Sequence, residues 1–157
     1  MHTFMENRKT VKIFSSTATD APIIYLNTNT DKGQQVYEAA QATGCLPFTL
    51  VVISDLDWNH DMVPWDNQAA FKKGKPFTGG ADDYLRLLVE ELIPRAEKEL
   101  AGPPAWRGIA GYSLAGLFAL YAIYQTDVFS RVGCVCPVPC GFLVSRNTSF
   151  PTNRSAG

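Results

Sequence analysis

The sequence predicts an α/β fold with a doubly wound, mostly parallel sheet. Apolar segments with strand character alternate with helical segments along the chain, and this alternation is typical of parallel strands covered by helices on both faces. The chain has 157 residues, of which 46% are hydrophobic and 18% charged. Its length suits one domain with a sizeable core. The charged share lies below the usual value of roughly 25%, which argues against disorder.

Three strands are expected in the first third of the chain. Residues 10–15 alternate apolar and polar side chains, as in a strand with one solvated face. Residues 22–26 form a continuous apolar run, which suits a strand covered on both sides. A polar loop, residues 27–33, and a short helix, residues 34–43, are predicted next. Residues 48–54 are rich in β-branched side chains and are predicted as the third strand.

The middle of the chain combines a long loop with a long helix. Residues 55–80 lack a regular pattern, and connections of this length in compact domains are usually functional or disordered. The aromatic residues of this stretch favour an ordered loop that packs over another part of the protein. Residues 81–100 are predicted as an amphipathic helix. Asp82 and Asp83 in its first turn suit the helix dipole, and Pro94 is expected to kink it.

The passage Gly-Tyr-Ser-Leu-Ala-Gly, residues 111–116, contains the candidate catalytic serine of the sequence. A short apolar strand precedes it and an apolar helix from about Leu114 to Gln125 follows it. In a nucleophile elbow, a serine occupies a sharp turn between a strand and a helix, so that its Oγ stands above the sheet. Ser113 has this position. A glycine-rich packing turn without catalytic meaning is the alternative reading.

The elbow requires small residues two positions before and two positions after the serine, because the turn brings backbone close to backbone. Gly111 and Ala115 meet this requirement, although glycine is usual where Ala115 stands. The backbone N–H of Leu114, at the start of the helix, is expected to stabilise an oxyanion. A second donor is expected from the loop after an earlier strand, for which Asn27, Thr28 and Asn29 are the candidates.

Four segments of the chain resemble the putative esterase family of α/β-hydrolases, which includes esterase D and the siderophore (enterochelin-type) esterases. They are PIIYLN, FTLVVISDLDWNHDMVPW, FTGGADDYLRLLVEELIP and WRGIAGYSLAGLFALYAIYQTDVFSRV. The resemblance runs from about residue 20 to Val132. It implies an α/β-hydrolase sheet and acyl transfer from a small-molecule ester to Ser113 and then to water, with no metal or organic cofactor. It also makes Asp57, Trp58 and His60 pocket or loop-anchoring residues.

The chain lacks the rest of a catalytic triad. In this fold the order along the chain is serine, then Asp or Glu, then His. Asp127 is the one acidic residue after Ser113, and both histidines, His2 and His60, precede it. Without an imidazole nearby, a serine hydroxyl stays protonated and is a poor nucleophile. We therefore expect a serine hydrolase scaffold that is inactive alone. The alternative is a non-catalytic binding or interaction module that retains the elbow as a structural relic.

The last part of the chain departs from the family pattern. The family tends to continue after Val132 with Ser-Gly-Ser-Leu-Trp-Phe-Pro-Gly, and one choice of codons for residues 136–144 spells this continuation when read from the third base. This predicts a frameshift between about Arg131 and Cys136. Residues 1–135 are then the N-terminal part of the domain and residues 136–157 an aberrant, disordered tail. A genuine short member with its own C-terminus is the alternative.

Composition excludes several other classes of function. The net charge of −1 and the lack of a basic stripe argue against nucleic acid as a partner. Residues 109–124, the most apolar stretch, fall short of the roughly 18 residues of a membrane span. No secretory signal opens the chain, so a cytoplasmic protein is expected. The clustered cysteines at 134, 136 and 140 lack CxxC spacing, so no metal site is expected.

The predicted frameshift truncates the domain, and this has a structural consequence. The strands that normally follow the elbow are expected to be absent, which leaves the sheet incomplete on its C-terminal side. The helix predicted from Leu114 to Gln125 is apolar nearly all round, so we expect it to pack against other segments on several of its faces. Exposed apolar surface and a bare sheet edge predict self-association through that edge.

Overall fold

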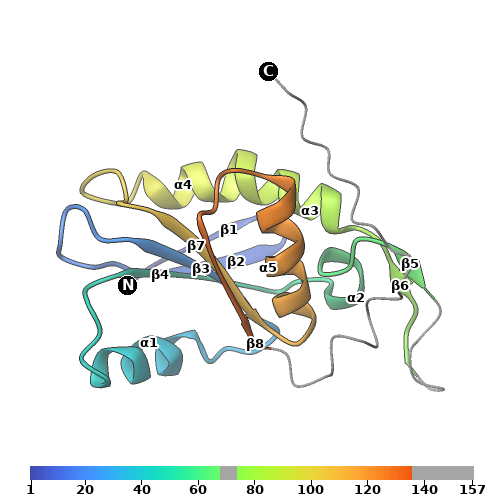
Figure 1. Cartoon of the computed structure of the whole chain (residues 1–157), viewed down its shortest axis with the longest axis horizontal. Helices are drawn as coiled ribbons and strands as arrows, with labels where there is room; N and C mark the ends of the chain where they lie inside the picture. The colour runs from blue at the N-terminus through green and yellow to red at the C-terminus, as the bar shows by residue number, and fades with distance from the viewer. Residues whose placement is uncertain (68–73, 136–157) are drawn as a thin grey trace.

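Six strands form the main sheet of the protein, whose computed structural model describes residues 1–67 and 74–135 (Figure 1). The strands are β1 (His2–Glu6), β2 (Lys9–Phe14), β3 (Ile23–Asn27), β4 (Thr49–Ser54), β7 (Arg107–Tyr112) and β8 (Arg131–Val135). They lie in the order β1-β2-β4-β3-β7-β8. Strands β4, β3, β7 and β8 run parallel, while β1 and β2 form an antiparallel extension next to β4. The sheet is mostly parallel, as predicted.

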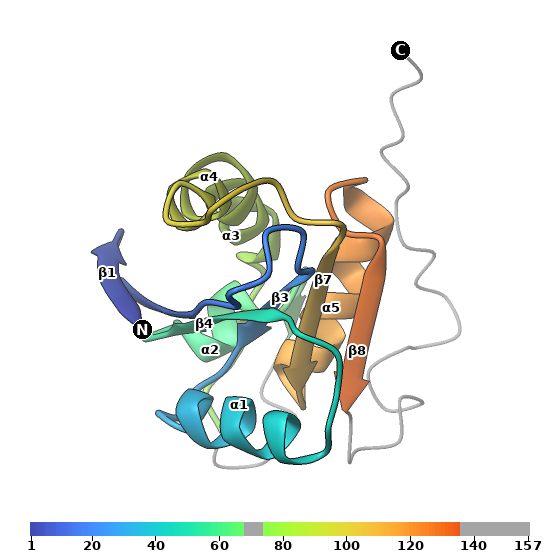
Figure 2. The same cartoon turned by 90° about the vertical axis from the view of Figure 1, so that its left-hand side faces the viewer.

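Helices cover both faces of this sheet (Figure 2). One face carries α1 (Gly33–Ala42), which packs on side chains of β2, β3 and β4. The other face carries a continuous helical run and the helix after the elbow. The run consists of α3 (Ala81–Leu87), the π-helical segment η1 (Leu88–Leu92) and α4 (Ile93–Glu97), and the helix after the elbow is α5 (Leu114–Gln125). The doubly wound prediction is confirmed.

The two faces bury cores of different size. The larger core lies between the sheet and the helices α3 to α5, and it includes Tyr25, Leu88 and Phe118, each at most 2% exposed. The smaller core lies under α1 and centres on Phe14, Leu50 and other residues of β2 and β4. Because the central strands have apolar side chains on both faces, they read as continuous apolar runs in the sequence.

The first strand was not predicted from the sequence. Strand β1 pairs with β2 through a tight turn in which Asn7 and Arg8 both have positive φ, at 47° and 65°. Two consecutive residues with positive φ are typical of the type I′ turn that matches the twist of a hairpin. Asn7 is a usual residue in such a turn but Arg8 is not, so the turn signal in the sequence is weak.

The long loop contains more regular structure than its sequence indicates. Residues 58–61 form the short helix α2 (Trp58–Asp61), and two-residue strands β5 (Asp66–Asn67) and β6 (Phe77–Thr78) pair with each other. The rest of the stretch is irregular where it is described, and residues 68–73 lie outside the described part of the chain. The described parts of the loop that contain α2, β5 and β6 lie beside the carboxyl ends of the strands (Figure 1).

The kink predicted at Pro94 takes the form of a π-helical segment. Proline lacks an N–H and its ring collides with the carbonyl group four residues earlier, which here belongs to Glu90. That residue lies inside η1, where the helix widens to the i to i+5 pattern and so accommodates the ring. The helical run ends at Glu97, three residues before the predicted end.

One further strand stands on the side of the sheet that was expected to lack strands. Strand β8 pairs in parallel with β7, with Gly111 opposite Cys134. One strand that follows the elbow is therefore present where such strands were expected to be absent, and it is the outermost strand on that side among the described residues. The predicted tail, residues 136–157, with Cys136 and Cys140, lies outside the described residues.

Candidate active site

Ser113 lies at the sharp turn between β7 and α5. Its backbone has φ 59° and ψ −124°, a conformation that residues with a side chain rarely adopt. Such strain persists only when the surrounding structure fixes it. Here the Ser113 amide donates to the carbonyl oxygen of Val135 at 2.8 Å, and the Ser113 carbonyl accepts from the amides of Gly116 and Leu117 at 2.9 and 3.1 Å.

The small residues of the elbow are required by close contacts. A Cβ placed on Gly111 would lie 2.3 Å from the carbonyl carbon of Ala115. A Cβ on Gly116 would lie 2.9 Å from the Sγ of Cys134 and 3.0 Å from the carbonyl oxygen of Gly111. Distances below 3.0 Å are not tolerated without movement, so the spacing that identified the elbow in the sequence has a steric cause. Ala115 is fully buried, and its methyl group occupies the space that Gly111 leaves.

The elbow stands at a topological switch point of the sheet. Strand β3 leads into α1 on one face, whereas the neighbouring strand β7 leads into α5 on the other (Figure 2). In open α/β sheets, ligands bind outside the carboxyl ends of the strands at the point where the connections diverge in this way. The register pairs Asn27 with Gly111, so the loop after β3 begins beside the elbow.

The predicted oxyanion donors differ in their availability. Leu114 is the first residue of α5, and an amide at this position has no partner within its own helix. The amide of Thr28 donates to the carbonyl oxygen of Ile53 at 3.0 Å and is therefore occupied. The amide of Asn29 has no hydrogen-bond partner among the described residues. Of these two loop amides, that of Asn29 is therefore the one available to a ligand.

The side chain of Asn27 belongs to a buried polar contact that the sequence did not reveal. Its Oδ1 accepts a hydrogen bond of 2.5 Å from the hydroxyl group of Tyr84 on α3, and the residue is 1% exposed. Its Nδ2 is buried and has no partner within the described part of the chain. Burial, followed by the charge of Asp61, holds the pKa of Tyr84 well above its usual range, so the hydroxyl remains a donor.

Asp61 is the one carboxylate among the buried residues of the described part of the chain. It forms an ion pair with Lys9 and accepts a hydrogen bond of 2.8 Å from the amide of Asp57. Lys9 also lies over the ring of Tyr84, with Nζ 5.8 Å from the ring centroid. The pair ties α2 to the start of β2 and thereby fixes the loop that follows β4.

The three predicted pocket residues make loop-anchoring contacts. Trp58 packs against the larger core, and Asp57 precedes α2, where its backbone accepts from the amide of His60. His60 Nδ1 shares a hydrogen bond of 2.7 Å with the hydroxyl group of Thr78. A Cβ on Gly80 would lie 2.2 Å from Nε2 of His60, so the ring rests directly on the backbone at the start of α3. Their role in a pocket stays a prediction.

Neither of the two histidines makes a contact with Ser113. His2 lies on β1, where its Nδ1 is 3.6 Å from a carboxylate oxygen of Glu99. Three strands separate β1 from β7, which corresponds to about 19 Å at the usual strand spacing. Asp127 is exposed just beyond the end of α5. Among the described residues, the hydroxyl group of Ser113 has no hydrogen-bond partner.

The described residues contain no group of three or more His, Cys, Asp or Glu side chains that could hold a metal ion. Over the same residues, no helix has both the length and the apolarity needed to cross a membrane.

Solved structures with the same fold share low sequence identity with this chain. The BES protein from Bacillus cereus is 22% identical, with a TM-score of 0.64 over 79% of this chain and 56% of that one. The enterobactin hydrolase IroE in complex with DFP is 21% identical, with a TM-score of 0.63 over 85% and 59%. The enterobactin esterase FES from Shigella flexneri is 18% identical, with a TM-score of 0.52 over 78% and 32%. No curated protein gave a significant match.

The first of these structures is matched over only about half of its own length. The family model described as "Putative esterase" matches residues 18–155. The change of reading frame after about Val132 stays a prediction from the sequence. Because the match takes in most of the chain, the protein belongs to the Putative esterase family.

Proposed function

We propose that the chain provides the nucleophile and oxyanion-binding part of a serine carboxylic ester hydrolase. Ser113 is the nucleophile, and its attack on an ester carbonyl forms a tetrahedral oxyanion and then an acyl-serine with release of the alcohol. Water then hydrolyses the acyl-serine and restores the hydroxyl group. The strained conformation of Ser113 at the strand–helix turn is the observation that carries this proposal.

The oxyanion receives one hydrogen bond from the amide of Leu114. The N-terminal end of α5 adds the positive end of the helix dipole at the same place. The second donor comes from the loop of Asn27, Thr28 and Asn29, and within it the amide of Asn29 has the required freedom. The Tyr84–Asn27 hydrogen bond beneath this loop supports its position.

The alcohol and acyl groups are those of a small-molecule ester. Two of the similar structures are named as an enterobactin hydrolase and an enterobactin esterase, and these names support ester hydrolysis as the class of reaction. The short helix α2 and the residue before it follow the carboxyl end of β4 and are candidates for shaping the substrate pocket through Asp57, Trp58 and His60. No cofactor is needed for this chemistry.

The chain alone is expected to turn over slowly. Neither histidine has a contact with Ser113 in the structure, so we expect its hydroxyl group to be a poor nucleophile. Oxyanion stabilisation and substrate binding nevertheless retain roughly 10³- to 10⁴-fold catalysis over water when triad residues are removed from serine proteases. A base supplied from solution should therefore restore part of the missing step.

Rescue with imidazole tests this proposal. Hydrolysis of p-nitrophenyl acetate is measured against imidazole concentration for the wild-type chain and for Ser113→Ala. Free imidazole hydrolyses the ester by itself, so the informative quantity is the difference between the two proteins. We expect a rate in excess of the Ser113→Ala rate that grows with imidazole. Equal rates at every imidazole concentration would exclude Ser113 as the nucleophile.

A non-catalytic binding or interaction module is the second candidate function. Both histidines have partners other than Ser113, since His2 contacts Glu99 and His60 contacts Thr78. This favours the non-catalytic module. The elbow would then be retained for packing alone. Equal rates of the wild type and Ser113→Ala, together with an intact fold of both, would select this reading.

A further inference from the structure

A polar pocket lies beside the loop that joins β3 to α1. Its volume is about 390 Å³, within the roughly 300–1,000 Å³ of small-molecule sites. Its lining residues are Thr10, Lys12, Asn29, Thr30, Asp31, Ser54, Asp55 and Leu56. All but Leu56 have polar side chains, which sets this pocket apart from the mostly apolar pockets that bind drug-like molecules.

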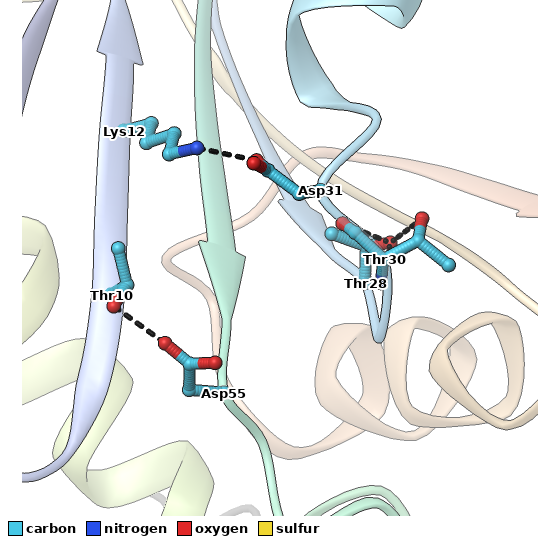
Figure 3. A network of polar contacts seen from close by, with 6 residues as sticks. All are labelled: Thr10, Lys12, Thr28, Thr30, Asp31 and Asp55. Carbon is cyan, nitrogen blue, oxygen red and sulfur yellow. Dashed lines mark hydrogen bonds and ion pairs between the residues drawn. The ribbon is translucent and has the colours of Figure 1, made fainter.

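Two polar contacts between lining residues lie one beyond the other along β2 (Figure 3). Lys12 on β2 reaches to Asp31 in the loop after β3 and forms an ion pair with it. Closer to the end of the sheet, the hydroxyl group of Thr10 donates to Oδ2 of Asp55 at 2.6 Å. Ser54 lies opposite Thr10 in the register of β2 and β4, next in sequence to Asp55.

The loop wall is held in place by its own hydrogen bonds. The hydroxyl group of Thr28 accepts from the amide of Thr30 at 3.1 Å, and the amide of Thr28 is tied to Ile53. The first residue of α1, Gly33, packs so closely on Val52 that a Cβ there would lie 2.6 Å from a methyl carbon. The lining residues of the loop are therefore presented by a fixed backbone.

The lining groups keep both donors and acceptors unused. The Lys12 ammonium group has three N–H donors and the ion pair with Asp31 uses one. Thr10 donates to Asp55, so its oxygen can still accept, and Asp55 retains its second oxygen. The side chains of Asn29 and Ser54 make no hydrogen bond within the described residues. A ligand group that both donates and accepts would satisfy this mixture, and hydroxyl groups do so.

The charges of the pocket disfavour ionic ligands. Lys12 is the one cation among the lining residues, and it is already neutralised by Asp31, while Asp55 would repel an anion such as phosphate. A compact cation would use only the acceptors of the pocket and would leave the remaining N–H donors of Lys12 and the side-chain amide of Asn29 without partners. We propose that this pocket binds a neutral polyhydroxylated molecule, a sugar or sugar alcohol, through Lys12, Asn29, Ser54 and Asp55. The pocket shares Asn29 with the loop proposed to bind the oxyanion, but binding of a polyol there does not require hydrolase activity.

Residue-specific NMR tests the proposal on the full chain. Amide shifts are followed in ¹⁵N–¹H spectra during titration with D-sorbitol, with putrescine and inorganic phosphate as parallel probes. Thermal shifts are unsuitable because polyols stabilise most proteins by exclusion from their surface. We expect saturable sorbitol shifts confined to Asn29, Thr30, Ser54 and Asp55. A linear response spread over the surface would overturn the site, as would saturation at this pocket by putrescine or phosphate but not by sorbitol.

Asp55→Asn is the decisive variant. Asp55 has φ 58°, and asparagine tolerates this left-handed conformation well and can still accept from Thr10. The variant therefore removes a charge while it keeps the fold. Because charge-assisted hydrogen bonds are about twice as strong as neutral ones, the dissociation constant for sorbitol should rise by about fivefold or more. Asp20→Asn, at an exposed position outside the pocket, is the matched control and should leave it unchanged. Equal affinity of Asp55→Asn and the wild type would contradict the proposed contacts, and Ser54→Ala provides a second variant with the same expectation.

Discussion

Gly111 and Ala115 meet across the turn that carries Ser113, with the Cβ of Ala115 only 2.6 Å from the place where a Cβ on Gly111 would stand. The alanine at the second small position of the elbow is compatible with the turn because the first position has no side chain. The backbone of α5 therefore packs directly on β7. This contact fixes the position of Ser113 relative to the sheet.

Gly111→Ala is expected to destabilise the protein strongly. The added methyl group would overlap backbone atoms of Ala115, which cannot rotate away as a flexible side chain can. We expect a loss of about 3 kcal/mol in the free energy of unfolding, at the upper end of overpacking substitutions. Urea denaturation measures it. Gly102→Ala is the control, since its nearest atom is the Thr19 carbonyl oxygen at 3.2 Å. A similar small effect of both substitutions would contradict the close contact.

Ser113→Gly is expected to stabilise the fold. The φ of 59° with ψ of −124° costs a residue with a side chain about 1–3 kcal/mol, whereas the extra freedom of glycine in the unfolded chain costs about 0.5–1 kcal/mol. The balance predicts a gain of about 1 kcal/mol, measured by urea denaturation. Ser113→Ala keeps a Cβ and should stay near the wild type. If Ser113→Gly were the less stable of the two, the strained turn would be excluded.

Tyr84→Phe is expected to lower stability by about 1–3 kcal/mol, because it leaves the buried Oδ1 of Asn27 without a donor. Tyr112→Phe, at a residue that is 58% exposed, is the matched control and should have little effect. Chemical denaturation at neutral pH compares the three proteins. An unchanged stability of Tyr84→Phe would show that the hydrogen bond to Asn27 contributes nothing.

The same tyrosine predicts a loss of stability at alkaline pH. Burial raises the pKa of both Tyr84 and Tyr25 above the ordinary value, so the folded protein holds these protons when the unfolded chain has lost them. Stability is then complete below the unfolded pKa of about 10 and falls as pH rises beyond it. Denaturation between pH 8 and pH 11 should show this slope, and Tyr84→Phe should reduce it. A slope that is the same in both proteins would contradict the assignment.

Self-association through the C-terminal edge of the sheet remains a prediction from the sequence. Strand β8 is the outermost strand on that side among the described residues, and its Val132 and Val135 are 37% and 62% exposed. A lysine on an edge strand opposes pairing with another chain. Val132→Lys should therefore shift the sedimentation of the protein toward the monomer. Thr3→Lys, on the opposite outer strand, is the control and should shift it less. A monodisperse wild-type monomer would exclude the prediction.

The strand, the turn and the helix around Ser113 could be predicted from the sequence because the constraint is local. Ser113, Gly111 and Ala115 lie within five residues, and the required order of strand, turn and helix can be read from a single apolar passage. Strands β3 and β4 could also be predicted from their continuous apolar runs. Strands covered on both faces show such runs, whereas strands with one solvated face alternate apolar and polar residues.

Contacts between distant segments could not be predicted in this way. Asn27 and Tyr84 are 57 positions apart, and nothing in either segment shows that β3 and α3 bring them together. The polar pocket likewise depends on Lys12 reaching Asp31 across an intervening strand. His60 was assigned to a pocket or to loop anchoring, and only the second role has contacts in the structure, through Thr78 and Gly80.

Labelling with a fluorophosphonate tests the nucleophile role of Ser113 most directly. The full chain is treated with the probe with and without imidazole, and mass spectrometry of the peptides gives the labelled fraction at each serine. Exposed Ser130 serves as the internal control within the same molecule. The elbow and its oxyanion donors predict labelling of Ser113 that increases with imidazole and exceeds that of Ser130 at least about tenfold. Labelling of Ser113 no faster than that of Ser130 in the presence of imidazole would contradict the assignment of Ser113 as the nucleophile.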